Sequence, residues 1–293
     1  GDLAAYKQFG LWNFITGAYG DNILTWDHKT FTHSPLENVI DLLQKLPSGI
    51  TLHLITHSRG GLVGDILARA SSANINIGFS DAELALFAEG SNERMCMQTI
   101  NTLAREKNIV VQKFIRVASP SMGTSLLSNR LDHYLNTLLN FIGISTGILA
   151  NPVYAGFKAL VAEVAATKAK VDVLPGIEAM VPESPFIKML NNPANIIEAP
   201  LTVLSGNCTL HVELKALLVI LTKLYFRRKN DMVVDTWSMY FGTPRKKDIW
   251  FFLDDSKGAD HIHYFRSKDS QEAITRALRA ESDVIPGFKT LQE

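Results

Sequence analysis

Apolar and polar residues follow two different periods along the chain. Residues 50–56 form a short, mainly apolar run, and a helix-compatible segment follows at 60–70. A helical pattern over 95–107 leads into a second run, rich in β-branched residues, at 110–118. Short apolar runs that alternate with helical patterns predict a mostly parallel sheet with helices on both faces.

The same pattern predicts elements on either side of this stretch. Ser34, Pro35 and Glu37 have the spacing of a helix N-terminus, and Pro47–Ser48–Gly49 ends that helix. The other predicted elements are a strand over 22–27, loop or irregular helix over 71–92, strands over 200–206 and 248–253, and a closing helix over 270–280.

Composition narrows the class of protein. The 293 residues are 46% hydrophobic and 20% charged, which is typical of a globular chain. Basic and acidic residues number 29 each, so nothing indicates a nucleic-acid partner. The two cysteines, Cys96 and Cys208, set no disulfide framework, and a cytoplasmic location is expected. No Cys/His spacing indicates a metal, and no glycine-rich loop indicates a nucleotide.

Ser58 lies where the apolar run at 50–56 gives way to the helical pattern at 60–70. Such a strand–turn–helix transition holds a serine on a sharp turn with its hydroxyl exposed. A serine hydroxyl becomes a useful nucleophile when a base lies beside it and backbone N–H groups face the oxyanion. Ser58 is therefore the candidate nucleophile and the N–H of Arg59 a candidate oxyanion donor, with a purely structural serine as the alternative.

Candidate acids and bases follow the last two predicted strands. Asp231 and Asp235 come after the strand at 200–206, and His261 and His263 come after the strand at 248–253. Because the carboxyl ends of parallel strands meet at one edge of a sheet, these loops should lie near Ser58. A Ser–His–acid site needs one member of each pair, and the spacing alone leaves both pairs open.

Together these motifs resemble the α/β-hydrolase superfamily, in particular its lipase-like branch, over roughly residues 19–278. The matching segments are Thr56-His57-Ser58-Arg59-Gly60, the turn Ser119-Pro120-Ser121-Met122-Gly123-Thr124, Leu174-Pro175-Gly176, Pro182-Glu183-Ser184-Pro185-Phe186 with Leu190-Asn191, Asn230-Asp231 with Val233-Val234, and His261 with Tyr264-Phe265. The resemblance favours Asp231 over Asp235 and His261 over His263. It implies an α/β-hydrolase fold: a mostly parallel sheet, helices on both faces and an inserted helical cap.

The resemblance implies a serine hydrolase of carboxylic esters, of the lipase, phospholipase or esterase kind, that needs no cofactor and no metal. Its expected substrate is an acyl ester or lipid. A thioesterase or acyltransferase would use the same three residues. A binding module or effector, released by proteolysis or completed by a partner, is the alternative that is not an enzyme.

An apolar, almost uncharged stretch at 134–166 lies where this superfamily inserts its caps. We expect a single domain over 1–293 with a cap over about 122–199, and a core helical hairpin is the alternative. The apolar character favours a lipidic substrate and peripheral contact with a membrane. The basic clusters 227–229 and 245–247 are expected to be solvated loop ends, with contact to a phosphate headgroup or acidic partner as the alternative.

One expected segment is missing from the front of the chain. The superfamily places a strand ending in His-Gly before the strand predicted at 22–27, and the following loop supplies half of the oxyanion hole. Residues 1–20 contain no such segment, and residue 1 is glycine. We expect a longer natural polypeptide, with this strand removed, cleaved or supplied by a second chain.

Several other residues should shape the site. Asp27 and His28 end the strand predicted at 22–27, near the same edge of the sheet, and are expected to shape the site by hydrogen bonds, with a structural role as the alternative. Met122 lies in the small-residue turn, and the histidine of the 261/263 pair that is not the base should cap a turn or line the site. His57 is expected to support the site, with substrate contact as the alternative, and His53 is expected in the core.

Overall fold

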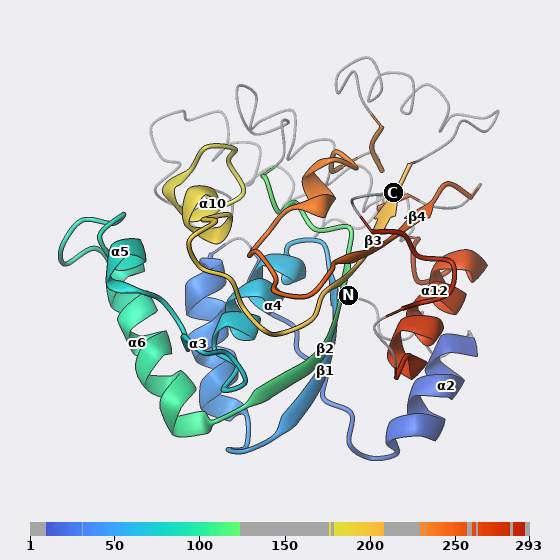
Figure 1. The fold of residues 1–293 in the computed structure, drawn as a ribbon, viewed down its shortest axis with the longest axis horizontal. Helices are drawn as coiled ribbons and strands as arrows, with labels where there is room; N and C mark the ends of the chain where they lie inside the picture. Colours follow the sequence, from blue (N-terminus) through green and yellow to red (C-terminus); the bar gives the residue numbers. More distant parts are fainter. Residues whose placement is uncertain are drawn as a thin grey trace, which may run out of the picture.

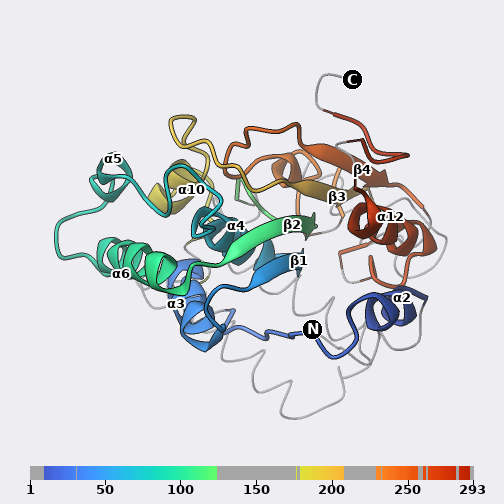
Figure 2. The same ribbon diagram turned by 60° about the horizontal axis from the view of Figure 1, so that its bottom comes forward.

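A computed structural model describes residues 10–30, 32–123, 176, 179–207, 229–231, 233–256, 260–261, 263–281 and 284–290. Within these ranges, four strands form one sheet in the order β1-β2-β3-β4. The strands are β1 (Thr51–His57), β2 (Val110–Val117), β3 (Thr202–Gly206) and β4 (Trp250–Asp254). All neighbouring strands are parallel, so their carboxyl ends share one edge. Figure 2 shows the strands side by side in chain order.

Helices cover both faces of this sheet (Figure 1). On one face lie α3 (Pro35–Lys45), α4 (Gly60–Arg69) and α6 (Asn92–Lys107); on the other lie α2 (Gly10–Tyr19) and α12 (Lys268–Arg279). Shorter helices occur in the connections: α5 (Asp81–Leu84), α10 (Pro185–Leu190) and the 3₁₀ turn η3 (Ser238–Tyr240). The protein therefore has the α/β architecture with a parallel sheet that the sequence predicts.

Local signals set the start of the helix α3. The Ser34 hydroxyl accepts from the backbone N–H of Glu37, and the Glu37 carboxylate accepts from the N–H of Ser34 at 2.7 Å. These two bonds form the capping box that satisfies free N–H groups at a helix start. Leu36, Val39 and Leu43 are fully buried on the inner face.

The helix α4 packs against β2 through two glycines. A Cβ on Gly61 would lie 2.3 Å from the Ser119 hydroxyl, and a Cβ on Gly64 would lie 2.5 Å from the Phe114 ring. Neither distance leaves room for a side chain. The glycines thus allow the helix that follows Ser58 to lie directly on the sheet, which fixes where Ser58 stands.

At the front of the chain, one prediction is corrected and one helix was not predicted. Residues 22–27 are not a strand: no strand in the described ranges pairs with them, and Leu24 is 69% exposed. A strand needs a neighbouring backbone for its hydrogen bonds, which an apolar pattern cannot supply. The helix α2 was missed because its sequence carries few helix signals and includes Gly10 and Gly17.

Other sequence predictions agree with the structure or fall outside it. The helix predicted at 95–107 begins earlier, at Asn92, after the N-cap residue Ser91. Residues 71–92, expected as loop or irregular helix, contain only the short α5 and the first residue of α6. Most of the predicted cap, residues 124–175, and the arginines of the 227–229 cluster lie outside the described residues. No helix in the described ranges is both long and apolar enough to cross a membrane.

Candidate active site

Ser58 occupies a sharp turn between β1 and α4. Its backbone is left-handed, with φ of 53°, a conformation that is costly for a residue with a side chain. The turn is held from both sides: the Ser58 N–H donates to Val117 O at 2.9 Å, and the Gly61 N–H donates to Ser58 O at 2.9 Å. Strained backbone of this kind clusters at functional sites, where surrounding contacts maintain it.

The Ser58 hydroxyl is the end of a hydrogen-bonded chain of three side chains. His261 Nε2 lies 2.7 Å from Ser58 Oγ, and His261 Nδ1 lies 2.8 Å from Asp231 Oδ2. A neutral imidazole with its proton on Nδ1 fits both contacts, donating to Asp231 and accepting from Ser58. Asp231 is fully buried and His261 is 3% exposed. The sequence-predicted residues Ser58, Asp231 and His261 are therefore brought together.

The Asp231 carboxylate has donors on both oxygens. Oδ1 accepts from the backbone N–H groups of Val233 at 3.1 Å and Val234 at 2.8 Å. Oδ2 accepts from His261 and from the hydroxyl of Tyr264, which lies 3.0 Å away. The His261 N–H also donates to Asp231 O at 3.0 Å. Four donors hold the carboxylate in one orientation, and the backbone bond ties the acid turn to the histidine turn.

His57 supports His261 from behind. Its Nε2–H donates to the backbone carbonyl of His261 at 2.6 Å, and the two rings lie 5.1 Å apart. Loss of solvent around the ring and, to a smaller extent, the nearby His261 lower the pKa of His57 to about 3. His57 is therefore neutral near pH 7. These contacts match the predicted supporting role, and the substrate contact that was the alternative is not tested.

Arg59 fixes the turn through its side chain. The side chain is almost fully buried: its Nε–H donates to Gly176 O at 3.0 Å, and its Nη2 donates to His33 O. The elbow is thereby joined to two segments far from it in sequence. The Arg59 N–H belongs to the residue after Ser58, at the start of α4, where a helix N-terminus favours negative charge.

His28 lies beside the first turn of α4. A Cβ on Gly60 would be 3.5 Å from His28 Cε1. Burial and, to a smaller extent, the charge of Arg59 lower the pKa of His28 to about 4, so the ring is neutral near pH 7. Within the described residues, its Nε2 is buried without a hydrogen-bond partner. Asp27 is exposed, and its charge acts on His28 in the opposite direction.

The competing candidates make other contacts. His263 Nδ1 lies 2.6 Å from Asp260 Oδ1, and its N–H also donates to Asp260, so His263 caps its own turn as expected for the second histidine. Asp235 pairs through its backbone with Asn230. Met122 is half-buried, and its N–H donates to Ser238 Oγ at 3.0 Å. His53 lies on β1 with both ring nitrogens hydrogen-bonded but is only half-buried.

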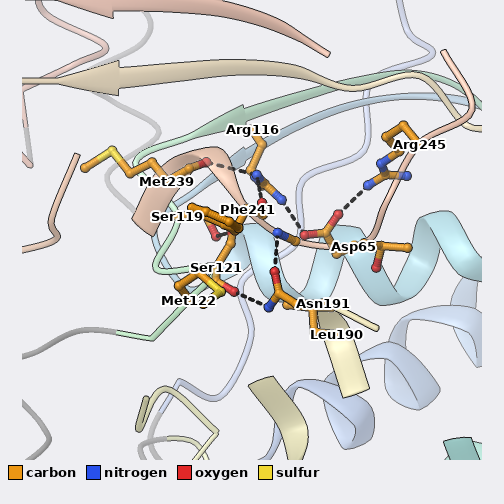
Figure 3. A network of polar contacts seen from close by, with 12 residues as sticks. Asp65, Arg116, Ser119, Ser121, Met122, Leu190, Asn191, Met239, Phe241 and Arg245 are labelled. Atoms are coloured by element: carbon orange, nitrogen blue, oxygen red, sulfur yellow. Dashed lines mark hydrogen bonds and ion pairs between the residues drawn. The ribbon is translucent and has the colours of Figure 1, made fainter. Parts of the chain in front are cut away.

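A buried ion network braces the loops around the site (Figure 3). Asp65 on α4 accepts from Arg116 Nη1 at 2.5 Å and from Arg245 Nη2, and the three side chains are fully buried. The expectation that the 245–247 cluster is solvated is therefore wrong for Arg245. Burial lowers the pKa of Arg245 to about 10, and the Asp65 carboxylate opposes that shift. The guanidinium thus stays charged near pH 7.

The same network connects three loops. Arg116 Nη2 donates to Met239 O at 2.9 Å, which holds η3 against the end of β2. Asn191, after α10, donates to Ser121 O at 2.8 Å and accepts from the Gly242 N–H at 2.8 Å. The turn after β2 and the segment after the acid turn are thus fixed relative to one another.

Sequence reasoning missed the Tyr264 contact with Asp231. A signal was present, since Tyr264 follows His261 by three residues and so shares its turn. For Asp65 and Arg116 no local signal exists, because their contact joins a helix to a strand 51 residues later. Among the described residues, no group of three or more His, Cys, Asp or Glu side chains is arranged to hold a metal ion.

Comparison with known proteins gives one result. No curated protein matches the sequence at a significant level. A family model described as "Domain of unknown function (DUF7379)" matches residues 4–80 and 90–279, which is most of the chain. The protein therefore belongs to the DUF7379 family.

Proposed function

We propose that the protein is a serine hydrolase that cleaves carboxylic esters, of the lipase or esterase kind. The observation that carries the proposal is the hydrogen-bonded chain Asp231–His261–Ser58, with distances of 2.8 Å and 2.7 Å. Nucleophile, base and acid stand in the roles that acyl transfer requires.

Acylation follows from this geometry. Ser58 Oγ attacks the ester carbonyl carbon while its proton passes to His261 Nε2, and Asp231 stabilises the imidazolium that forms. The negative charge on the carbonyl oxygen is stabilised by the N–H of Arg59 at the start of α4. When the intermediate collapses, the C–O bond of the ester breaks and His261 gives the proton to the leaving alcohol.

Deacylation repeats these steps with water. His261 takes a proton from water, the hydroxide attacks the acyl carbonyl, and the bond to Ser58 Oγ breaks. The carboxylic acid leaves and Ser58 recovers its proton. The proton transfers of both halves of the reaction use Ser58, His261 and Asp231 of this chain, together with water and the ester.

The arrangement of the elements supports an α/β-hydrolase type of fold. Ser58 follows β1, Asp231 follows β3 and His261 follows β4, so the three residues reach the same edge of an all-parallel sheet. Their order along the chain is serine, acid, histidine, which is the order of that superfamily. The left-handed backbone of Ser58 agrees with its nucleophile elbow.

The test is covalent labelling with a fluorophosphonate, in which serine Oγ attacks phosphorus and fluoride leaves. The full natural chain should be labelled on Ser58, and Ser58→Ala should not be labelled. Ser72→Ala is the matched control, since the Ser72 hydroxyl donates to Ile109 O and touches no residue of the site. Equal, poor labelling of wild type and Ser58→Ala would overturn the proposal.

A second assay defines the substrate. Hydrolysis of p-nitrophenyl esters of increasing chain length, beside the matching thioesters, ranks acyl length and leaving atom by kcat/KM. Preference for oxygen esters supports the proposal, and preference for thioesters would replace it by a thioesterase that uses the same three residues.

A further inference from the structure

We propose that Tyr264 is a positioning residue for the acid and the base: its hydroxyl donates to the Asp231 oxygen that also accepts from His261, and thereby sets how strongly Asp231 holds the His261 proton. The inference rests on the proposed function of the Ser58 site. It adds a fourth side chain to the three that the reaction requires.

The first argument is the contact itself. Tyr264 is fully buried, and its hydroxyl lies 3.0 Å from Asp231 Oδ2. His261 Nδ1 lies 2.8 Å from the same oxygen. The two donors therefore share one oxygen and its negative charge, while Oδ1 accepts from the N–H groups of Val233 and Val234.

The second argument is that the fold keeps the hydroxyl in place. A Cβ on Gly206, the last residue of β3, would lie 2.2 Å from Tyr264 Oη and 2.8 Å from Cζ. The tyrosine therefore fills space that any other residue at position 206 would occupy. Thr236 Oγ1 donates to Gly206 O at 2.6 Å, which holds that backbone beneath the ring.

The third argument concerns the proton on the hydroxyl. Burial raises the pKa of Tyr264 well above its ordinary value, and the negative charge of Asp231 raises it further, followed by Asp254 and Asp260. The hydroxyl therefore stays protonated over the working range. A buried neutral donor beside a carboxylate spreads part of its negative charge without neutralising it.

Removal of this donor should strengthen the attraction between the Asp231 carboxylate and the protonated form of His261. Asp231 from the acid turn and His57 from β1 contact His261 directly, and His57 is neutral near pH 7. The carboxylates of Asp254 and Asp260 also act on the neighbouring Tyr264, and both remain in the variant. Loss of the Tyr264 hydroxyl leaves the Asp231 charge less dispersed. His261 then keeps its proton to higher pH and is available as a base only above that pH.

The experiment is Tyr264→Phe, which removes one oxygen atom and keeps the ring. The rate of fluorophosphonate labelling of Ser58 is measured from pH 5 to pH 9. The midpoint of the rise with pH should move upward by about one unit, which is about a tenfold loss of rate below the midpoint. Tyr240→Phe is the matched control: the Tyr240 hydroxyl accepts from Ser205 at 3.3 Å, and its ring packs on Phe251. Its midpoint should equal that of wild type.

The possible results separate the two proposals. If wild type is not labelled at any pH, the hydrolase proposal fails. If wild type is labelled and Tyr264→Phe has an unmoved midpoint, the role of Tyr264 is overturned, whether or not its overall rate falls. A lower melting temperature with an unmoved midpoint would show that the hydroxyl only stabilises the fold.

A measurement on the wild type does not depend on the variant's folding. In proton NMR, the Tyr264 hydroxyl should exchange slowly with solvent and show a cross-relaxation peak to the His261 Nδ1 proton. The same peak is expected in Ser58→Ala, which is inactive under the hydrolase proposal. A hydroxyl that exchanges rapidly and shows no such peak would contradict the Tyr264 inference and leave the hydrolase proposal untouched.

Discussion

Asp231 and Asp65 are both fully buried aspartates near the carboxyl edge of the sheet, but their partners differ in charge. Asp65 lies between the guanidinium groups of Arg116 and Arg245. Asp231 accepts from two backbone N–H groups, the Tyr264 hydroxyl and the His261 imidazole. Asp65 has two guanidinium partners that stay charged, whereas among the four donors to Asp231 only the His261 imidazole can gain a positive charge.

This difference separates a structural role from a proposed chemical one. Asp65 pairs with two guanidinium groups in the folded state, and no step of the proposed reaction changes the charge of these groups. In the reaction proposed above, the partner of Asp231 becomes positive only when His261 takes the Ser58 proton. An interaction that strengthens at that moment lowers the barrier, whereas one of constant strength contributes to folding alone.

The largest expected effect is on the rate of ester hydrolysis. Asp231→Asn should lower kcat for ester hydrolysis by about 10⁴-fold, because an amide in that place no longer holds His261 in the required tautomer. Steady-state kinetics on a p-nitrophenyl ester measure it. Asp235→Asn is the matched control and should retain kcat within a few-fold. Equal activity of the two variants would overturn the assignment of the acid.

The next effect is on stability. Asp65→Ala should lower the free energy of unfolding by about 3–5 kcal/mol, because it leaves two buried guanidinium groups without their carboxylate. Urea denaturation followed by circular dichroism measures it. The control is Glu198→Gln, which breaks a more exposed pair with Lys246 and should cost less than about 1 kcal/mol. Similar losses in both variants would refute the contrast between the two regions.

The smallest effect is a dependence of stability on pH. His57 has a folded pKa of about 3 and an ordinary value of 6.5, so its contribution is complete above pH 6.5. Below pH 6.5 the His57 side chain binds a proton in the unfolded chain but stays unprotonated in the folded chain until the pH approaches 3. Stability should then fall by up to about 1.4 kcal/mol per pH unit.

Urea midpoints at pH 7, 6 and 5 measure this slope in wild type and in His57→Gln. The variant should lose less stability over that interval, because it carries no titrating group at position 57. Identical slopes would show that His57 is not held neutral by the fold. His28 has its own lowered pKa of about 4 and contributes in the same direction in both proteins, so it does not affect the difference.

Most of the fold was predictable because its signals are local. The capping residues Ser34 and Glu37 and the strand–turn–helix around Ser58 each lie within a few residues of the element they define, and the histidine turn follows β4 closely. Parallel packing then brings the turns to one edge. The choice of Asp231 and His261 came from the resemblance to a family, and the hydrogen bonds agree with it.

What could not be predicted depends on distant contacts. The strand expected at 22–27 has an apolar pattern but no neighbouring strand in the described ranges. Arg245 has the sequence context of a solvated loop, but Asp65, 180 residues earlier, draws it into the interior. The local sequence shows which residues carry charge, but it does not show whether a distant residue forms a buried ion pair with them.

The order of the strands has a consequence for the time at which the site comes into being. The serine follows β1, the acid follows β3 and the histidine follows β4, so the three residues emerge from the ribosome in that order. A nascent chain that has reached Gly206 carries Ser58 and neither its acid nor its base. The proposed hydrolase is thus inactive during most of its own synthesis. It can become active only when the turn after β4 has folded and placed His261 beside Ser58.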